Sequence, residues 1–312
     1  MSFLSAGARA RARALWLPSL HALDPAFKSA KWVVLGDGAT GAVFLNEGSD
    51  RVYKIWRRAR LAGIRECTVG TYVQRVNAAA FAGFENYWQI GDTFVGASAN
   101  HGAVDLYSLV DVISPALLAH YMRQLVHVVA ELHAMSILHN DIKLENILVA
   151  PDNTVRLTDW GCASFGEGGC GGGTVPYNHP RVAGRAERTR TTDYYALLVT
   201  MFTACERPKV VYNDMARYEK ALLRAPAPYF DMMAYALGKL RLMHAHPAAE
   251  YDIKDGLLRQ LSYYDDGVPA TRPNYLERAL GRPGRGGALP RPPADGRVHP
   301  EVAEDARARH SA

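Results

Sequence analysis

Four polar side chains with complementary chemistry lie close together in one stretch of the sequence. Two short apolar runs flank a turn at residues 151–153, a pattern that predicts a β-hairpin. Asp141, Lys143 and Asn146 lie at or just before the first run, and Asp159 follows the second. Because a hairpin brings its two outer ends together, we expect these side chains to converge. Two carboxylates, an amide and an ammonium group at one point could bind a divalent metal and phosphate, with one carboxylate left to accept a proton.

This stretch resembles the catalytic and metal-binding loops of eukaryotic-type protein kinases. Residues 139–146 read His-Asn-Asp-Ile-Lys-Leu-Glu-Asn, and residues 159–161 read Asp-Trp-Gly. The lysine two places after the first aspartate resembles the serine/threonine branch of the family. The resemblance covers about residues 31–279 and implies an α+β, bilobal protein-kinase-like fold. One lobe would hold a small antiparallel sheet with one helix, and the larger lobe would be mostly helical.

The resemblance implies a role for each polar residue. Asp141 would accept the proton of the substrate hydroxyl, and Lys143 would neutralise charge on the moving phosphoryl group. Asn146 and Asp159 would hold Mg²⁺. Thr174, in a stretch that resembles the end of the family's activation segment, would hydrogen-bond Asp141 and Lys143. ATP and Mg²⁺ are therefore the expected cofactors, and a protein is the expected substrate.

A glycine-rich turn lies near the start of the chain, where residues 36–41 read Gly-Asp-Gly-Ala-Thr-Gly. Glycines let the backbone approach phosphates and point N–H groups at them. A dinucleotide-binding turn has similar spacing but needs a helix directly after it. Here β-type residues follow, which favours the strand–turn–strand arrangement of kinases. The cofactor-binding residues expected in this region are Gly36, Asp37, Gly38, Ala39, Thr40, Gly41 and Val43, the last of which would cover the adenine.

Further nucleotide-binding candidates follow the glycine-rich turn. Lys54 resembles the family lysine that binds the α- and β-phosphates, although an ordinary surface lysine on an edge strand is the alternative. Val52 stands where the family usually has an alanine that lines the adenine pocket. Asp105 precedes a short predicted helix, where it could either reach the ribose hydroxyls or cap the helix.

Residues 59–78 show the apolar spacing of a helix. Glu66 is the only acidic residue in this segment, and the resemblance makes it the expected partner of Lys54. The alternative is a solvated charge on the helix surface. Gly63 and Gly70 lower the helix propensity of the segment, which predicts a mobile helix.

The chain departs from the family pattern at several positions. Asn140 replaces an arginine that usually binds a phosphorylated activation loop, and the loop itself is mostly glycine, so we expect activity without phosphorylation of this loop. Trp160 replaces a phenylalanine, and its bulk should oppose flipping of its loop. Glu145 lies beside the expected substrate groove and points to substrates with arginine near the acceptor. Arg181 stands where the family has a glutamate that pairs with a late arginine, here Arg272, so this pair cannot form.

Composition sets broad limits on the class of protein. The chain has 312 residues, 48% of them hydrophobic, and a net charge of +5. The apolar content suits one large or two small domains, and no apolar run approaches the length of a membrane span. The short apolar patch after the first arginines does not predict a secretory signal. The four cysteines lack metal-ligand spacing, which is typical of reduced thiols.

Charge and composition also set expectations for organisation and partners. Much of the positive charge lies in two arginine-rich tails, so we predict no nucleic-acid partner. We also expect no membrane partner, a monomer, and a cytoplasmic or nuclear location. We expect residues 1–30 to be a partly disordered extension with at most one short helix. Residues 31–98 and 99–279 would be the two kinase lobes, and residues 280–312 a disordered Gly/Pro/Arg-rich tail.

Two other functions remain open beside a serine/threonine protein kinase. A pseudokinase scaffold would lack one of the catalytic groups, yet all are present. A small-molecule kinase of the aminoglycoside or choline type shares an H-x-D motif and a distal acid, but gives no reason for Lys143 or for residues 173–180. The catalytic-loop residues and compact loops resemble kinases of large DNA viruses, such as the baculovirus late kinases, which would place the protein in a host cell.

Overall fold

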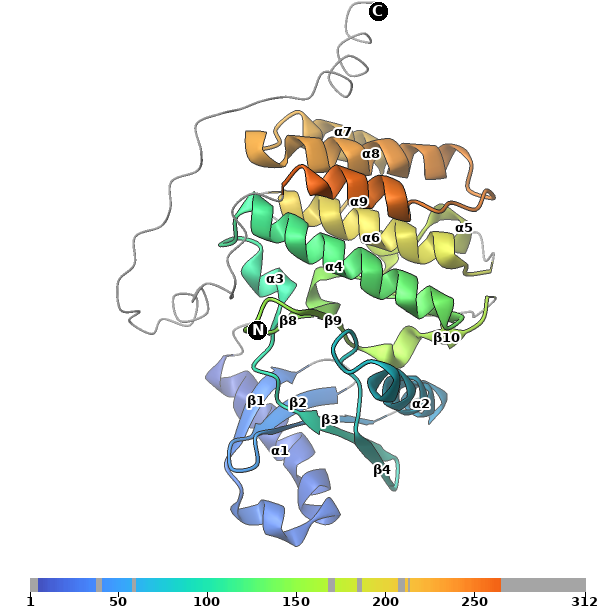
Figure 1. Ribbon diagram of the computed structural model, residues 1–312. Coiled ribbons are helices and arrows are strands. Elements are labelled where there is room, and N and C mark those ends of the chain that lie inside the picture. Colours follow the sequence, from blue (N-terminus) through green and yellow to red (C-terminus); the bar gives the residue numbers. More distant parts are fainter. Residues whose placement is uncertain are drawn as a thin grey trace, which may run out of the picture.

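A computed structural model describes residues 5–37, 41–57, 60–167, 172–183, 187–206, 211–212 and 214–264. The chain forms a sheet-rich lobe, which ends near residue 99, and a helical lobe that follows it (Figure 1). This arrangement is the α+β, bilobal protein-kinase-like fold that the sequence predicts. The expectations for Gly38, Ala39, Thr40, Arg272 and the tail at residues 280–312 lie outside the described residues.

The first lobe is built on a five-stranded antiparallel sheet with strand order β1-β2-β3-β5-β4. The strands are β1 (Trp32–Asp37), β2 (Gly41–Asn46), β3 (Arg51–Arg57), β4 (Asn86–Ile90) and β5 (Thr93–Ala99). Buried and half-buried side chains alternate along β2 because successive residues point to opposite faces. β5 ends at Ala99, one residue beyond the boundary expected for the first lobe at residue 98.

Helix α1 (Ala6–Leu23) covers one face of this sheet (Figure 1). Ala12, Trp16 and Leu20 recur every four residues, so their side chains form one buried stripe against the strands. The expected partly disordered extension at residues 1–30 is therefore, from residue 5 onward, an 18-residue helix followed by a short 3₁₀ helix at Pro25–Ser29. The stripe is spread between arginines and alanines, and Pro18 suggests a helix break, so the sequence pattern conceals the helix.

Trp16 should contribute a large part of the stability of this lobe. We expect Trp16→Ala to lower the free energy of unfolding by about 3 to 5 kcal/mol, because it leaves a large cavity beneath the sheet. Urea unfolding followed by circular dichroism measures the change. Leu15→Ala, at the exposed neighbouring position, should shift it by less than about 0.5 kcal/mol. Equal effects of the two substitutions would show that α1 does not pack on the sheet.

Helix α2 (Arg60–Val76) packs on the opposite face of the sheet, against Trp56 and Phe94. A Cβ atom at Gly63 would lie 2.8 Å from the Phe94 ring, and one at Gly70 would lie 3.0 Å from the Trp160 indole. These glycines therefore allow close packing, and the expectation that they make the helix mobile stays a prediction. Their small size places α2 directly against the sheet and the loop after residue 158.

The second lobe is mainly helical, and its core is built around two helices, α4 and α6. Its helices are α3 (Leu106–Leu109), α4 (Pro115–Ala134), α5 (Pro180–Ala183), α6 (Arg190–Cys205), α7 (Met215–Leu222), α8 (Phe230–Ala245) and α9 (Lys254–Ser262). Every residue of α6 from Thr191 to Cys205 is buried, so this helix is the central support of the lobe. Within the described ranges, no helix is both long and apolar enough to span a membrane.

Short strands form two small sheets in the second part of the chain. One small sheet has the order β6-β8-β9, formed by β6 (Val104–Asp105), β8 (Ile147–Val149) and β9 (Val155–Leu157). A second pairs β7 (Ile137–Leu138) with β10 (Ser164–Phe165). β8, β9 and β10 lie between the five-stranded sheet and the helices of the second lobe (Figure 1). Polar residues described below lie just outside the ends of β8 and β9.

Candidate active site

The hairpin predicted around residues 151–153 is present, and it brings the expected polar residues together. β8 and β9 pair antiparallel, with Val149 opposite Val155. At the outer end of the hairpin, the backbone N–H of Thr158 donates to the carbonyl of Asn146 at 3.1 Å. Asp159 therefore follows directly on a residue that is bonded to Asn146, as the convergence argument requires.

Asp141 has both carboxylate oxygens fixed by neighbours. Its Oδ1 accepts hydrogen bonds from the backbone N–H and the hydroxyl of Thr174, each at 2.8 Å. Its Oδ2 lies 3.0 Å from Lys143 Nζ and accepts from Asn146 Nδ2 at 3.0 Å. Lys143 Nζ also donates to the Thr174 hydroxyl at 2.8 Å, which is the contact that the sequence predicts for these three residues. The carboxylate thus has one orientation, which a proton acceptor in phosphoryl transfer needs.

Asp193, in the first turn of α6, fixes the backbone of the catalytic loop from below. Its carboxylate accepts hydrogen bonds from the N–H groups of His139 at 2.9 Å and Asn140 at 2.8 Å, and contacts His133 Nε2 at 3.0 Å. Burial opposes ionisation, but the hydrogen bonds lower the pKa of Asp193 below its usual range. The stability from this charge is therefore present above the ordinary carboxyl pKa and is lost as the pH falls through the lowered value.

Removal of this buried carboxylate should be costly. We expect Asp193→Ala to lower the free energy of unfolding by about 3 to 5 kcal/mol, because two buried N–H groups lose their acceptor. Asp214→Ala is the matched control, since Asp214 caps the exposed start of α7 and should cost about 1 kcal/mol. Chemical denaturation at pH 7 compares the two. Similar losses would mean that Asp193 does not anchor the loop.

His139 connects the two ends of the hairpin. Its Nε2 lies 3.0 Å from the carbonyl of Thr158, and its Nδ1 accepts from the N–H of Asp141 at 3.3 Å. Because a carbonyl can only accept, the proton lies on Nε2. The imidazole therefore fixes the position of Thr158 relative to Asp141, the candidate base.

Lys54 forms one ion pair within the sheet-rich lobe and one with the helical lobe. Its Nζ contacts the carboxylate of Glu66 and lies 2.9 Å from Asp159 Oδ1. The side chains of Lys54 and Glu66 are only 25% and 8% exposed, so neither is the surface charge of the alternative interpretation. Burial alone would lower the pKa of Lys54, but Asp159 and Glu66 raise it above its ordinary value. For Glu66, burial raises the pKa and Lys54 opposes the shift.

Asp159 has the properties of a metal ligand. The positive charge of Lys54 holds the pKa of Asp159 below its usual range, and Lys143 contributes to the same shift. Its backbone is left-handed (φ +70°), a conformation that is uncommon outside glycine and often found at functional sites. Its side chain is 43% exposed, so the carboxylate remains accessible.

The donor set fits Mg²⁺ bound together with a nucleotide. Mg²⁺ is usually held by one or two protein oxygens, with substrate phosphates and water completing an octahedron. Asp159 supplies an accessible carboxylate. The amide nitrogen of Asn146 is used by Asp141, so its amide oxygen is the atom with the chemistry of a ligand. Lys54 lies beside Asp159 and would meet phosphate oxygens.

The remaining nucleotide-binding candidates lie on strands around the same site. Gly36 and Asp37 end β1, and Gly41 begins β2, where a Cβ atom would lie 2.2 Å from the carbonyl of Ile55. Val43 is paired with Lys54 across the sheet. The glycines therefore flank the turn next to the lysine, as the strand–turn–strand interpretation predicts.

Val52 and Asp105 lie near the connection between the lobes. Val52 is half-buried and is paired with Ser98 on β5. Asp105 Oδ1 accepts hydrogen bonds from the N–H and the hydroxyl of Ser108, each at 2.8 Å. Asp105 is thus the N-cap of α3, which is the second of its two expected roles. Its contact with ribose stays a prediction.

Trp160 is enclosed on all sides. The indole is 1% exposed, donates from Nε1 to the carbonyl of Ala82 at 3.0 Å, and contacts the rings of Phe81 and His139. The sequence argument that its bulk opposes flipping is consistent with this packing. Through Gly70, the same side chain presses against α2, the helix that carries Glu66.

Two contributors to the site were missed by the sequence argument. Asn140 was considered only as a lost arginine, yet its side chain donates to the carbonyl of Cys162 at 3.0 Å and to Ser164 Oγ at 3.1 Å. Arg188 is buried and contacts Asn140, Gly172 and Asn178. It lies in no recognised motif, and a lone arginine between two segments gives no signal of burial.

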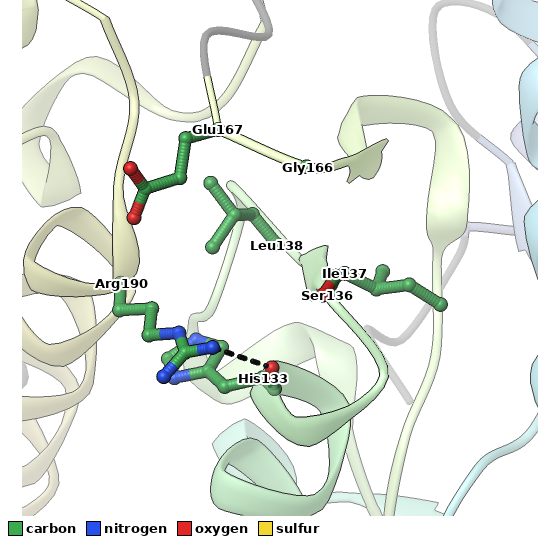
Figure 2. A pocket seen from close by; sticks show the side chains of 7 residues that line it. All are labelled: His133, Ser136, Ile137, Leu138, Gly166, Glu167 and Arg190. Atoms are coloured by element: carbon green, nitrogen blue, oxygen red, sulfur yellow. Dashed lines mark hydrogen bonds between the residues drawn. The ribbon is translucent and has the colours of Figure 1, made fainter.

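A cavity of about 140 Å³ lies beside the catalytic loop, and none of the predicted site residues lines it. Figure 2 shows Arg190, at the start of α6, with its guanidinium bonded to the carbonyl of His133 at 3.2 Å. The lining residues are His133, Ser136, Ile137, Leu138, Gly166, Glu167 and Arg190.

Comparisons with known proteins agree with the fold. A family model for the protein kinase domain matches residues 93–236. The chain is 37% identical over 114 residues to the PAS domain-containing serine/threonine-protein kinase of Mus musculus, which covers 33% of this chain and 8% of that protein. It is 28% identical over 148 residues to the Ribosomal protein S6 kinase-related protein of Homo sapiens, covering 45% and 36%.

A viral protein is also similar to this chain. The Serine/threonine-protein kinase US3 homolog of Equine herpesvirus 1 (strain Ab4p) is 28% identical over 142 residues, which cover 40% of this chain and 36% of the viral protein. The chain thus spans less than half the length of each of these three curated relatives. The two-lobed fold and the arrangement of residues 139–161 agree with the match of the protein kinase domain model to residues 93–236.

Proposed function

We propose that this protein is a serine/threonine protein kinase that transfers the γ-phosphoryl group of ATP, with Mg²⁺, to a protein hydroxyl. The observation that carries the proposal is the cluster around Asp141, in which Lys143 and Thr174 bind the same carboxylate. Asn146 connects the two acidic groups, because its side chain donates to Asp141 Oδ2 at 3.0 Å and its carbonyl accepts from the N–H of Thr158, the residue before Asp159. This is the arrangement that in-line phosphoryl transfer between a bound nucleotide and a hydroxyl requires.

Each residue would act through its own chemistry. Bound Mg²⁺ would neutralise charge on the phosphates, and Asp159 and Asn146 would hold it. Lys54, oriented by Glu66, would bind phosphate oxygens. The acceptor oxygen would bond to the γ-phosphorus as the bond to the ADP oxygen breaks, and its proton would pass to Asp141. Lys143 would stabilise the negative charge that develops on the phosphoryl oxygens.

The same contacts argue against the two alternative functions. A pseudokinase scaffold has no need for Lys54, Asp141 and Asp159 in orientations fixed by ion pairs and hydrogen bonds. A small-molecule kinase does not require Thr174 to connect residues 172–178 to the candidate base. That connection suits a substrate that docks along this segment before its hydroxyl reaches Asp141.

A labelled-ATP assay separates the three functions. Purified protein would be incubated with γ-labelled ATP, Mg²⁺ and either a basic protein or small alcohols such as choline and an aminoglycoside. The proposal predicts label in the protein and none in the alcohols. Label in an alcohol would favour the small-molecule kinase, and no label combined with a Mg-ATP-dependent rise in melting temperature would favour the pseudokinase.

We also propose that activity does not depend on phosphorylation of the activation loop. The position that usually holds the phosphate-binding arginine is Asn140, whose side chain already donates to two neutral oxygens, at Cys162 and Ser164. Asn140 carries no positive charge, so it cannot form a charge-assisted hydrogen bond with a phosphate group. A phosphatase-treated preparation should keep its full rate, and a preparation that loses its activity would contradict this proposal.

Glu145 supports a further proposal about substrates. It follows Lys143 and Leu144 on the catalytic loop and is exposed, so its carboxylate is available to a basic side chain. We expect substrates with arginine near the acceptor hydroxyl, and arginine-rich proteins in general, to be favoured. We also propose that the enzyme is a monomer. A peptide array with an acidic preference, or an unchanged preference in Glu145→Gln, would remove this proposal.

A source in large DNA viruses is the corresponding proposal for the subfamily. The catalytic-loop sequence and the similarity to the equine herpesvirus protein support it. The baculovirus-type specificity and a cytoplasmic or nuclear location in the host cell are parts of the same proposal. A fluorescent fusion in host cells tests the location, and export or membrane retention would contradict it.

A further inference from the structure

Arg188 is a buried cation outside every motif of the proposed active site. It lies in the connection between α5 and α6 and is 3% exposed. Burial of a guanidinium is costly unless its N–H groups are bonded, so a buried arginine indicates a specific structural task. The contacts of this one define the task.

The guanidinium joins three segments that are distant in sequence. Nη1 donates to the carbonyl of Asn140 on the catalytic loop at 3.3 Å. Nη2 donates to the carbonyl of Gly172 and to Asn178 Oδ1, the latter at 3.4 Å. The planar fork of arginine can reach all three, whereas a lysine ammonium would not span the same directions. Arg188 therefore connects the catalytic loop to both ends of residues 172–178.

The segment held by Arg188 contacts the candidate base directly. Gly172 and Gly173 have φ values of +92° and +84°, which favour glycine. A Cβ atom at Gly173 would lie 2.5 Å from the carbonyl of Asn140, so the two loops touch. The next residue, Thr174, donates both of its groups to Asp141. A displacement of Arg188 from Gly172 would thus be transmitted through Gly173 and Thr174 to the carboxylate of Asp141.

The chain around Arg188 is fixed to the helical lobe from the other side. The hydroxyls of Thr189 and Thr191 donate to Glu250 Oε2 at 2.8 and 2.7 Å. Glu250 lies in the connection between α8 and α9. Two hydrogen bonds therefore tie the residues that follow Arg188 to the helical lobe, which restricts where the arginine can lie.

We propose that Arg188 is a positioning residue that holds residues 172–178 in the conformation that accepts a protein substrate. The inference rests on the proposed function. It adds that an internal arginine, bonded to carbonyl and amide oxygens, orders residues 172–178 in place of a phosphate group. Arg188 contacts neither Lys54 nor Asp159, so it acts on substrate binding and leaves nucleotide binding unchanged.

Arg188→Met and Arg188→Lys test the inference, with Arg190→Met as the matched control. Arg190 is exposed, two residues away, and makes one bond to the carbonyl of His133 (Figure 2). We expect Arg188→Met to raise KM for a peptide substrate by about 10- to 100-fold, with KM for ATP unchanged. Arg188→Lys should fall between Arg188→Met and wild type, and Arg190→Met should match wild type.

Hydrogen exchange gives a readout that does not depend on activity. Residues 172–178 should exchange faster in Arg188→Met than in wild type or Arg190→Met, while the sheet lobe should not change. Unchanged exchange, an unchanged peptide KM, or an equal loss of ATP affinity would overturn the inference. A wild-type protein without phosphoryl transfer would contradict the proposed function, and the exchange comparison would still decide the role of Arg188.

Discussion

Asp159→Asn is expected to lower the rate of phosphoryl transfer by about 10²- to 10³-fold while the protein stays folded. The substitution keeps the size of the side chain but removes the negative charge that would bind Mg²⁺ and that pairs with Lys54. The side chain is partly exposed, so its loss should cost little stability. Initial rates with γ-labelled ATP, together with thermal unfolding, measure both effects.

Asp152→Asn provides the control for this prediction. Asp152 lies in the turn of the same hairpin, is exposed, and should leave the rate unchanged. The pH dependence gives a second check. Because Lys54 holds the pKa of Asp159 below the ordinary value of about 3.9, the charge should persist as the pH falls from 8 to about 5. Mg-ATP binding that weakened across this range through Asp159 would contradict the account, as would equal rates for Asp159→Asn and wild type.

Asp141→Asn should lower kcat by about 10²- to 10⁴-fold, the usual contribution of a general base. An amide cannot accept the proton of the attacking hydroxyl, and its N–H₂ group would face Lys143 or Asn146 in place of a carboxylate oxygen. Asp141 has no proposed contact with the nucleotide, and Asn146 keeps its bond to the backbone carbonyl of residue 141, so KM for ATP should stay within about twofold of wild type. Steady-state kinetics with varied ATP measure this separation.

The outcome for Asp141 distinguishes a base from a structural residue. A structural role would lower the melting temperature and raise KM for ATP together with the loss in kcat. Loss of kcat alone, at a temperature well below unfolding, supports the proton-accepting role. An active Asp141→Asn protein would contradict the proposed mechanism and would direct attention to another proton acceptor.

The central geometry was predictable because it depends on short-range patterns. The turn at residues 151–153 fixes a hairpin, and a hairpin determines that Asn146 and Asp159 meet. The pairing of Lys54 with Glu66 followed from the family pattern and the absence of another acidic residue in the helix. In these places the local sequence and the tertiary contact carry the same information.

Other features depend on contacts that no local pattern records. Helix α1 has its apolar stripe spread among arginines, so only the sheet beneath it shows why Trp16 is buried. Gly70 lowers helix propensity, but its tertiary contact with Trp160 decides its role. An arginine is usually a surface residue, so the sequence gives no sign that Arg188 is buried. Its burial follows from how residues 172–178 fold over the catalytic loop.

Phosphoamino-acid analysis of a protein labelled by this enzyme tests the central claim most directly. Wild-type protein and Asp159→Asn protein, prepared identically, would be given γ-labelled ATP, Mg²⁺ and a substrate rich in serine, threonine and arginine. The account predicts labelled phosphoserine or phosphothreonine with wild type, and a loss of that label with Asp159→Asn or without Mg²⁺. Equal label from both proteins, label on tyrosine, or no label from wild type would contradict it.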